Sequence, residues 1–416
     1  MRKRKALVII CLCVVYLLNC AQVYGENDFG KQLYAQAAVL MDGSTGKVLF
    51  EKNGDEIKAM ASTTKIMTCI IALENGDLDS IVKVSKYAAS MPDVQLNIKE
   101  GEMYKLKDLL YSLMLESHND SAVAIAEHVA GSVDKFCELM NKKAIELGCE
   151  NTYFITPNGL DGEKEVDGVL KKHSTTAKDL AVIMKYCITN SQFLEITRTP
   201  NYSFKNIIQN KNGEYVSGNI TRNAINRNTL LKSMEGLISG KTGFTNDAGY
   251  CYVCAYENEG RVYIITLLGC GWPNNKNYKW SDTKELIKYG KETFVLKDFF
   301  DKNIQLPKIK VKGGITSKYY DFGKYGLGNE ENIYVKTYMD MGEVKCLSKD
   351  GEQISPTINV MNELEAPVKK GQVVGSVIYK IDEGIEKQFD IYAGDTIDKK
   401  DYQWAFGVVF SRFILH

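Results

Sequence analysis

The stretch AMASTTKIMT, residues 59 to 68, places Ser62 three positions before Lys65. At helical spacing, positions i and i+3 share one face, so the Ser62 Oγ and the Lys65 Nζ can touch. A serine beside an amine is either a helix cap with a lysine nearby or a nucleophile with its base. Ser-x-x-Lys occurs by chance in many proteins, so the rest of the chain has to decide between the two.

The beginning of the chain is typical of an export signal. Four basic residues at 2–5 precede an apolar run at 6–18, which is too short to span a membrane, and we expect a signal peptide over residues 1–25. Its removal takes four of the 52 Lys and Arg and none of the 52 Asp and Glu, so the net charge becomes −4. We therefore expect an exported protein at the outer face of the cytoplasmic membrane, without a nucleic-acid partner.

Eight of the eleven cysteines follow this segment, at irregular spacings. Several lie in apolar patterns, where a thiol behaves as a small buried hydrophobe, so we expect buried, reduced cysteines. Cys251 and Cys254 alternate to opposite faces of a predicted strand. No second pair matches them, and we expect no metal site.

The middle of the chain predicts an α+β domain over residues 26–300. Two strands in 34–53 come first, and three strands at 237–243, 248–257 and 261–269 come last. Between and after them, helical patterns end at Gly76 and Gly131 or open at a Ser/Thr cap. The helices are expected at residues 65–76, 105–115, 120–131, 174–190 and 282–300. This order predicts one antiparallel sheet with a helical subdomain.

Residues 301–395 change to short strands with turn residues, which predicts a small β-sandwich. The tail at 396–416 is amphipathic and too short to span a membrane. We expect it to lie on a membrane surface with Lys399 and Lys400 toward the headgroups; the alternative is a terminal helix packed on its own protein. The apolar face of the tail comprises Tyr402, Ala405, Phe406, Val409, Phe410 and Phe413.

Three short motifs stand in order: Ser62-Thr63-Thr64-Lys65, Ser117-His118-Asn119 and Lys241-Thr242-Gly243. Ser-x-x-Lys, Ser-Asp-Asn and Lys-Thr-Gly occur together in penicillin-binding proteins and class A β-lactamases. With these motifs, TPNGLDG at 156–162 and HSTTAKDLA at 173–181, the chain resembles the low-molecular-mass penicillin-binding proteins, the serine D-Ala-D-Ala carboxypeptidases. His118 stands where that family commonly has glycine, and we expect an altered cleft shape.

Base catalysis by Lys65 also follows from the residues themselves. The chain has four histidines, at 118, 128, 173 and 416, and little from which to build a Ser-His-Asp triad. Lys65 acts as a base only when neutral, so its pKa must fall by several units from the reference of about 10.4. Burial and the neighbouring charge of Lys241 supply that change. Ser62 at a helix N-terminus gains from the dipole, and its N–H helps to hold the oxyanion.

The remaining motif residues have expected roles around this pair. Ser117 fits a proton relay between Lys65 and the leaving amine, and Asn119 fits binding of a substrate amide oxygen, compatible with capping helix 120–131. Gly243 lets the strand approach the substrate. Lys241 and Thr242 are expected to meet the terminal carboxylate, whereas Lys279 is either a further carboxylate contact or a solvated surface lysine. The family resemblance implies the Phe244 N–H as the second oxyanion donor.

The resemblance implies a serine-type D-Ala-D-Ala carboxypeptidase without a cofactor. It removes the terminal D-Ala from peptidoglycan stem peptides through an acyl-enzyme on Ser62, which β-lactams also form. A β-lactamase is an enzymatic alternative, but it needs a deacylating glutamate, and no Glu-x-x-Leu-Asn segment lies between residues 116 and 243. The second alternative is a non-catalytic penicillin-binding sensor or scaffold.

Overall fold

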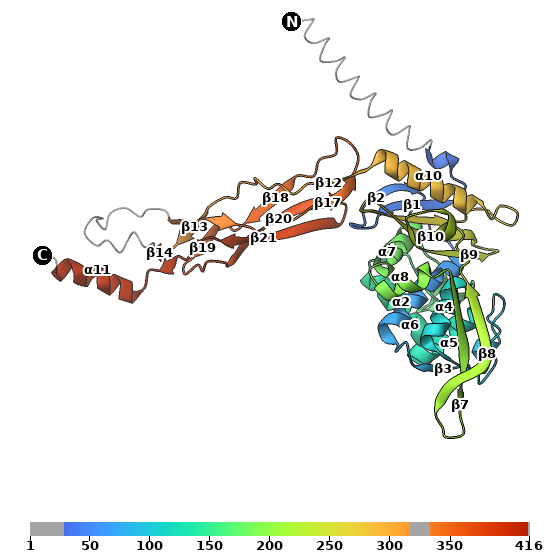
Figure 1. Ribbon diagram of the computed structural model, residues 1–416. Helices are drawn as coiled ribbons and strands as arrows, with labels where there is room; N and C mark the ends of the chain where they lie inside the picture. The colour runs from blue at the N-terminus through green and yellow to red at the C-terminus, as the bar shows by residue number, and fades with distance from the viewer. Residues whose placement is uncertain (1–28, 316–332, 415–416) are drawn as a thin grey trace, which may run out of the picture. The chain divides into compact units, whose positions relative to one another are not determined.

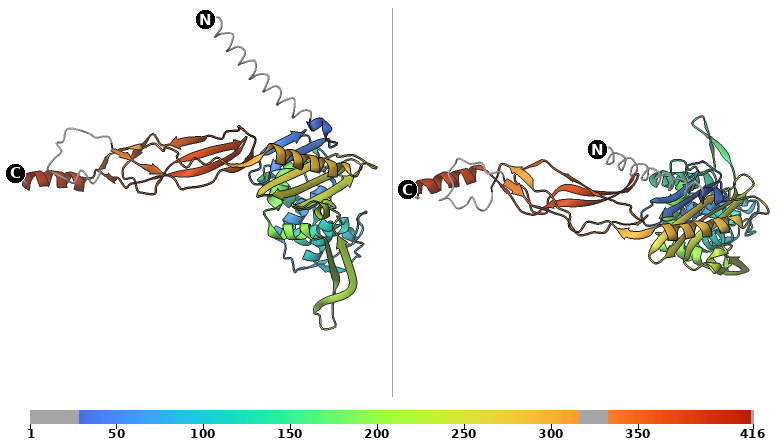
Figure 2. Two further views of the ribbon diagram at one scale, coloured as in Figure 1. Left: turned by 45° about the horizontal axis from the view of Figure 1, so that its top comes forward. Right: turned by 90° about the horizontal axis from the view of Figure 1, so that it is seen from above.

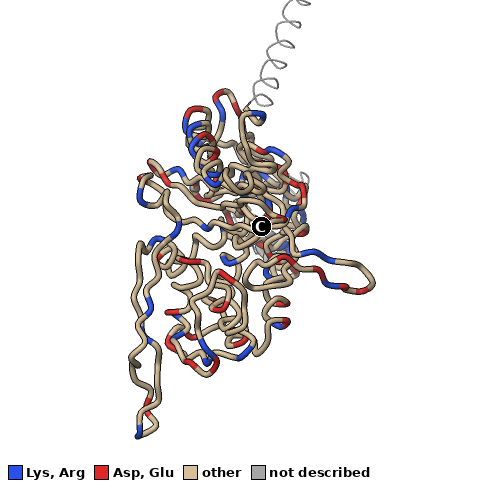
Figure 3. Tube along the Cα trace, turned by 90° about the vertical axis from the view of Figure 1, so that its right-hand side faces the viewer, with Lys and Arg blue, Asp and Glu red and all other residues tan. Residues whose placement is uncertain are grey.

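The computed structural model describes residues 29–315 and 333–414, so the predicted signal peptide lies outside the described part (Figure 1). The chain divides into two compact units, the first ending at Phe294 and the second beginning at Val295. Figure 3 shows Lys and Arg interspersed with Asp and Glu along the chain. Each unit has its own hydrophobic core.

The first unit is built on an antiparallel sheet with the strand order β2-β1-β11-β10-β9. Its strands come from both ends of the unit, as the sequence predicts: β1 (Ala37–Asp42), β2 (Val48–Lys52), β9 (Leu237–Thr245), β10 (Gly249–Asn258) and β11 (Arg261–Leu268). Gly290 of helix α10 (Tyr278–Thr293) packs directly against Leu40 and Tyr263 of this sheet. The β9 strand is an edge, so it offers one side of its backbone to a neighbouring cleft.

Helices cover both faces of this sheet (Figures 1 and 2). α10 lies on one face, and the helical subdomain lies on the other. That subdomain comprises η1 (Ala61–Thr64), α2 (Lys65–Asn75), α3 (Lys86–Ala89), α4 (Leu106–Leu115), α5 (Asn119–Ala130), α6 (Val133–Glu146), α7 (Ala177–Cys187), α8 (Ser191–Arg198) and α9 (Leu230–Ser233). The first eight residues of α2 are all buried, so this helix is the centre of the subdomain.

Smaller strands complete the first unit. A second sheet has the order β3-β4-β7-β8, and its β7–β8 hairpin is prominent in Figure 1. The strands are β3 (Ile81–Lys83), β4 (Met103–Lys105), β7 (Asn201–Gln209) and β8 (Tyr215–Ile225), with a separate hairpin of β5 (Glu163–Val166) and β6 (Val169–Lys172). Helix ends follow the sequence signals: α2 stops at Gly76, α5 stops at Gly131 with φ +80°, and Thr176 caps α7.

The predicted helix over residues 282–300 is wrong at both ends. α10 begins at Tyr278 and ends at Thr293, and the next residues form β12 (Val295–Asp298), which pairs with β17 (Lys345–Ser348). The apolar spacing of 294–300 suits a helix as well as a strand. The partner that makes it a strand lies about 50 residues further along the chain, so local periodicity does not reveal it. The division between the units accordingly precedes the predicted boundary at 300.

The second unit is rich in β-structure, which confirms the predicted fold class. β16-β21-β20-β18 form its largest sheet, and β13 pairs with both β15 and β19. Besides β12 and β17, the strands are β13 (Ile309–Lys312), β14 (Gly314–Ile315), β15 (Ile333–Val335), β16 (Thr337–Tyr338), β18 (Pro356–Val360), β19 (Glu363–Glu365), β20 (Val373–Asp382), β21 (Ile385–Ala393) and β22 (Asp398–Lys399). Val335, Val377, Tyr379 and Ile391 lie in its core with no exposed surface.

Helix α11 (Tyr402–Ile414) follows β22, and its apolar side chains are exposed. Tyr402 is 95% exposed, Phe406 70% and Phe413 83%. Within residues 29–315 and 333–414, no helix has the length and apolar character that crossing a membrane requires.

The eight cysteines after the predicted signal are all buried thiols. Cys251 lies in the core between the sheet and the helical subdomain, whereas Cys254 lies beside Gly240 on the other face of β10. This arrangement agrees with the expectation of buried, reduced cysteines on opposite faces.

Candidate active site

Ser62 lies in η1, a short 3₁₀ helix that leads directly into α2. The Lys65 Nζ donates a hydrogen bond to the Ser62 Oγ at 2.9 Å, so the contact predicted from the spacing is formed. Neither η1 nor α2 has a side-chain cap at its N-terminus. Ser62 is therefore not a helix cap, and the nucleophile interpretation of the Ser-x-x-Lys stretch remains.

Lys65 is fully buried and its Nζ is surrounded by oxygen acceptors that carry no charge. Besides Ser62, the Nζ donates to the Asn119 Oδ1 at 2.9 Å and to the backbone oxygen of Asn158. Burial holds the pKa of Lys65 well below its ordinary value, the charge of Lys241 lowers it further, and Asp120 opposes them. This confirms the predicted direction and its causes. Asn158 acts through its backbone, which sequence reasoning missed within TPNGLDG.

Lys241 and Ser117 form the second polar pair of the site. The Lys241 Nζ donates to the Ser117 Oγ at 2.9 Å and to the Thr242 backbone oxygen at 2.8 Å. Ser117 has φ +72° in the short connection between α4 and α5, which turns its side chain toward β9. Its Oγ accepts a hydrogen bond from Lys241, and the predicted role of Ser117 as a proton relay stays a prediction.

The Asn119 side chain is held by the protein itself. Its Oδ1 accepts from Lys65, and its Nδ2 donates to the backbone oxygens of Pro92 and Asp93, each at 3.1 Å. The amide hydrogens are thus bonded to a loop that no local pattern connects to Asn119, and its predicted contact with the substrate stays a prediction. The predicted cap is wrong, because His118 is the N-cap and Asn119 is the first residue of α5.

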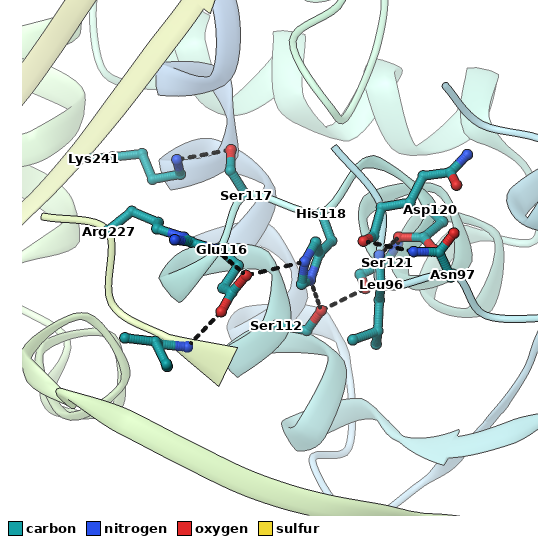
Figure 4. A network of polar contacts seen from close by, with 12 residues as sticks. Leu96, Asn97, Ser112, Glu116, Ser117, His118, Asp120, Ser121, Arg227 and Lys241 are labelled. Atoms are coloured by element: carbon teal, nitrogen blue, oxygen red, sulfur yellow. Dashed lines mark hydrogen bonds and ion pairs between the residues drawn. The ribbon is translucent and has the colours of Figure 1, made fainter. Parts of the chain in front are cut away.

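His118 points toward Ser112 and Glu116 (Figure 4) and does not line the cleft, so the expected change in cleft shape stays a prediction. Its ring is buried, with Nδ1 2.8 Å from the Ser112 Oγ and Nε2 3.6 Å from the Glu116 Oε2. Burial lowers the pKa of His118, while Asp120 and Glu116 act in the opposite direction. Glu116 accepts from the Arg227 Nη2 at 2.9 Å, and these two residues line the cleft.

Strand β9 brings Thr242, Gly243 and Phe244 beside the nucleophile. A Cβ added to Gly243 would stand 2.8 Å from the Ser62 backbone nitrogen, so the absence of a side chain allows this close approach. The Phe244 ring packs on Tyr250 with 4.6 Å between the centroids and remains 38% exposed. The structure therefore gives a physical reason for glycine at the third position of Lys-Thr-Gly.

Lys279 is a buried residue of the cleft and not a solvated surface lysine. It lies in the first turn of α10 and is 6% exposed. Its Nζ lies 4.5 Å from the Tyr250 ring centroid and 4.6 Å from that of Trp280, at distances typical of cation–π contacts. Burial lowers the pKa of Lys279 to about 8.

The side chains described above surround a cleft of about 490 Å³, a size common for small-molecule sites. Five of the eight predicted site residues are part of its wall: Ser62, Ser117, Thr242, Gly243 and Phe244. The three others lie just behind the wall and are almost fully buried: Lys65, Asn119 and Lys241. The wall also contains residues without a predicted role: Val94, Glu116, Arg227, Tyr250 and Trp280. They carry no motif, so sequence reasoning had no signal for them.

The motif residues from Ser62 to Gly243 lie within a part of the chain that matches a known family. Residues 24–270 match the peptidase S11 family, described as D-alanyl-D-alanine carboxypeptidase, and this range is more than half of the chain. The chain belongs to this family. Residues 323–399 also match the C-terminal domain of penicillin-binding protein 5.

Similar proteins agree with this assignment. D-alanyl-D-alanine carboxypeptidase DacF of Bacillus subtilis is 29% identical over 375 residues, which cover 88% of this chain and 87% of DacF. The crystal structure of a D-alanyl-D-alanine carboxypeptidase from Mycobacterium tuberculosis has a TM-score of 0.54 at 28% identity, covering 65% of this chain and 94% of that one. Penicillin-binding protein 5 from Haemophilus influenzae, at 24% identity, shares the fold over 88% of this chain and 98% of its own, with a TM-score of 0.64.

The family assignment confirms the predicted fold and enzyme class. This D-alanyl-D-alanine carboxypeptidase is a serine peptidase of the penicillin-binding type that acts on peptidoglycan. Formation of an acyl-enzyme and acylation by β-lactams are general to this family. The comparisons thus favour the carboxypeptidase over the β-lactamase alternative.

Proposed function

We propose that Ser62 is the acyl-ester nucleophile and Lys65 its base in the removal of the terminal D-Ala from peptidoglycan stem peptides. The observation that carries this proposal is the 2.9 Å hydrogen bond from the fully buried Lys65 to Ser62, where the other acceptors of its Nζ are the uncharged oxygens of Asn119 and Asn158. Neutral Lys65 takes the hydroxyl proton as the Ser62 oxygen attacks the carbonyl carbon of the penultimate D-Ala. The N–H groups of Ser62 and Phe244 stabilise the resulting oxyanion.

Ser117 delivers a proton to the departing D-Ala and takes one in return from the Lys241 ammonium, whose Nζ donates to its Oγ at 2.9 Å. Because the Ser117 Oγ accepts a hydrogen bond from Lys241, its own hydrogen is free to point toward the leaving amine. Collapse of the tetrahedral intermediate breaks the C–N bond, releases D-Ala and leaves the acyl group on Ser62. A water molecule then attacks this ester, and its proton passes through Ser117 to Lys241. The ester C–O bond breaks, the shortened stem peptide leaves, and Lys65 returns its proton to the Ser62 oxygen.

Recognition of the substrate terminus depends on buried cations. Lys241 and Thr242 bind the terminal carboxylate of the stem peptide, and Lys279 adds a second positive charge on the same cleft wall. Asn119 acts indirectly, because its side chain fixes Lys65 against the loop at residues 92–93.

The Michaelis constant for the peptide is expected to depend on pH through Lys241. Burial lowers the pKa of Lys241 to about 7, so its ammonium is present below that pH and is lost as the pH rises. We expect KM for a D-Ala-D-Ala peptide to rise between about pH 7 and 9, because the carboxylate loses its cationic partner. Steady-state kinetics across this range measure the effect. A KM that falls or stays constant would contradict carboxylate binding by Lys241.

Mass spectrometry after penicillin treatment tests the nucleophile assignment directly. The adduct should map to the peptide that contains Ser62, and the untreated protein should release D-Ala from a D-Ala-D-Ala peptide. An adduct on another serine would overturn the assignment. Labelling of Ser62 without any peptide hydrolysis would instead favour the sensor or scaffold alternative.

We propose that the mature chain is exported and contacts the outer face of the cytoplasmic membrane through residues 396–416. The support is the exposed apolar side of α11, with Phe406 and Phe410 stacked at 5.9 Å between ring centroids, and the preceding Lys399 and Lys400. In this arrangement, the catalytic domain at 26–300 and the β-sandwich at 301–395 lie on the cell-wall side of the membrane.

A double substitution in the tail is expected to weaken membrane binding. In co-sedimentation with phosphatidylglycerol vesicles, Phe406→Ser with Phe410→Ser should reduce partitioning about tenfold or more, because two aromatic rings no longer enter the interface. Tyr215→Ser with Val216→Ser on the exposed β7–β8 hairpin is the matched control and should bind like the unaltered chain. Equal binding by the tail variant would show that α11 is not the membrane contact.

A further inference from the structure

The peptide group between Ala61 and Ser62 links the nucleophile's N–H to a set of buried residues. A trans peptide is planar, so its C=O and N–H point in opposite directions as one rigid unit. Whatever holds the Ala61 oxygen therefore also aims the Ser62 N–H. The inference below rests on the proposed function, in which that N–H is an oxyanion donor.

The Ala61 oxygen is held from two sides. It accepts a hydrogen bond from the Thr64 Oγ1 at 2.8 Å, and a Cβ on Gly159 would stand only 2.1 Å from it, so the Gly159 backbone packs directly against the peptide. Ala61 itself has φ +48°, a left-handed conformation that residues other than glycine rarely adopt. A peptide orientation of this kind persists where its surroundings hold it in place, and Thr64 and Gly159 are those surroundings.

His173 determines the direction in which the Thr64 hydroxyl donates. The His173 Nδ1 faces the backbone N–H groups of Ile155 at 3.0 Å and Thr156 at 3.4 Å, so it must accept. In a neutral imidazole the hydrogen then lies on Nε2, which is 2.8 Å from the Thr64 Oγ1 and donates to it. The single hydrogen of Thr64 is left for the Ala61 oxygen. This is the assignment in which every donor meets an acceptor.

The charge state of His173 agrees with this hydrogen-bond chain. Burial lowers the pKa of His173 to about 3, and the charge of Lys65 adds to the effect. The ring is therefore neutral near pH 7. A second proton on Nδ1 would face two N–H groups, which the geometry does not accommodate.

We propose that Thr64 and His173 are positioning residues that aim the Ser62 N–H at the developing oxyanion. Both are buried and neither lines the cleft, so they do not touch the substrate. The space into which the N–H points is bounded by Gly243, whose missing Cβ leaves room beside the Ser62 nitrogen. An oxyanion donor acts on the tetrahedral state more than on the bound substrate, so loss of its aim reduces kcat and leaves KM nearly unchanged.

The test compares Thr64→Val, which removes the hydroxyl and keeps the shape, with Thr64→Ser, which keeps the hydroxyl. For each full-length variant, three quantities are measured: kcat and KM for a D-Ala-D-Ala peptide, affinity for a peptide boronic acid that forms a tetrahedral adduct on Ser62, and thermal stability. We expect Thr64→Val to lower kcat and boronate affinity together, by about 10- to 100-fold, with KM within about twofold. Thr64→Ser should stay close to the unaltered enzyme.

His173→Gln provides a second route and covers the case in which Thr64→Val does not fold. It should lower kcat and boronate affinity as Thr64→Val does, and the shape of the pH profile should not change, because His173 does not titrate in that range. Loss of a pH limb would show that His173 acts through its charge and would overturn the proposal.

Other outcomes distinguish a failure of this inference from a failure of the proposed function on which it rests. A fall in kcat with unchanged boronate affinity, or a parallel loss of stability and activity in both Thr64 variants, overturns the positioning role. Unaltered enzyme that neither releases D-Ala nor is labelled on Ser62 overturns the proposed function and the inference with it. Active unaltered enzyme with a fully active Thr64→Val variant overturns the inference alone.

Discussion

Ser62→Ala is expected to abolish the release of D-Ala and the covalent labelling by penicillin. The substitution removes the cleft-lining hydroxyl that accepts a hydrogen bond from the Lys65 Nζ at 2.9 Å and takes away only one atom. Removal of a serine nucleophile in a comparable hydrolase costs about 10⁶-fold in turnover, so a loss of at least about 10⁴-fold is expected here. D-Ala release and intact-mass labelling measure it.

Ser203→Ala is the matched control for this experiment. Ser203 is an exposed residue of β7, and its Oγ donates a hydrogen bond to the Asn223 Oδ1 of the same hairpin. This variant should retain full activity and one penicillin adduct per chain. D-Ala release by Ser62→Ala at the unaltered rate would place the nucleophile elsewhere.

Lys65→Arg is expected to lower the acylation rate by about 10²- to 10⁴-fold, the range associated with general-base catalysis. Arginine keeps a positive charge and hydrogen-bond donors, but it does not lose its proton in proteins. Lys65, in contrast, has its pKa lowered by burial and by Lys241, so it is available as a neutral base. Stopped-flow or quenched labelling with penicillin measures the rate.

The control for this substitution is Lys107→Arg, an exposed residue with a 3.9 Å ion pair to Glu195. It should acylate at the unaltered rate, which shows that the exchange of lysine for arginine is harmless in itself. Normal acylation by Lys65→Arg would mean that the residue at 65 serves as a fixed cation and that another group takes the proton.

Local signals in the sequence were sufficient to predict most of the helices and strands of the first unit. The three motifs identified the residues of the site, and glycine and threonine signals marked the ends of α2, α5 and α7. The position of strands at both ends of the first unit predicted its antiparallel sheet. These features depend on residues close together in the chain, where spacing and backbone preference carry the information.

Local patterns did not reveal contacts with partners from elsewhere in the chain. The Asn119 amide bonds to the loop at 92–93, and the Ser117 hydroxyl bonds to Lys241. The predicted helix over 282–300 failed for this reason, because residues 295–298 pair with a distant strand. His118 turned inward because Ser112 and Glu116 offer it partners in the helical subdomain. Lys279 is buried, and its ammonium lies against the rings of Tyr250 and Trp280.

The order and spacing of the three motifs were sufficient to predict the enzyme class and a lysine-activated serine. Folding supplied what those motifs lack. Burial of Lys65 and Lys241 lowers the pKa of each amine, Gly159 packs against the Ala61 oxygen, and Lys241 bonds to Ser117. Desolvation and hydrogen-bond direction arise from atoms that folding brings together, whereas residue spacing describes only neighbours along the chain.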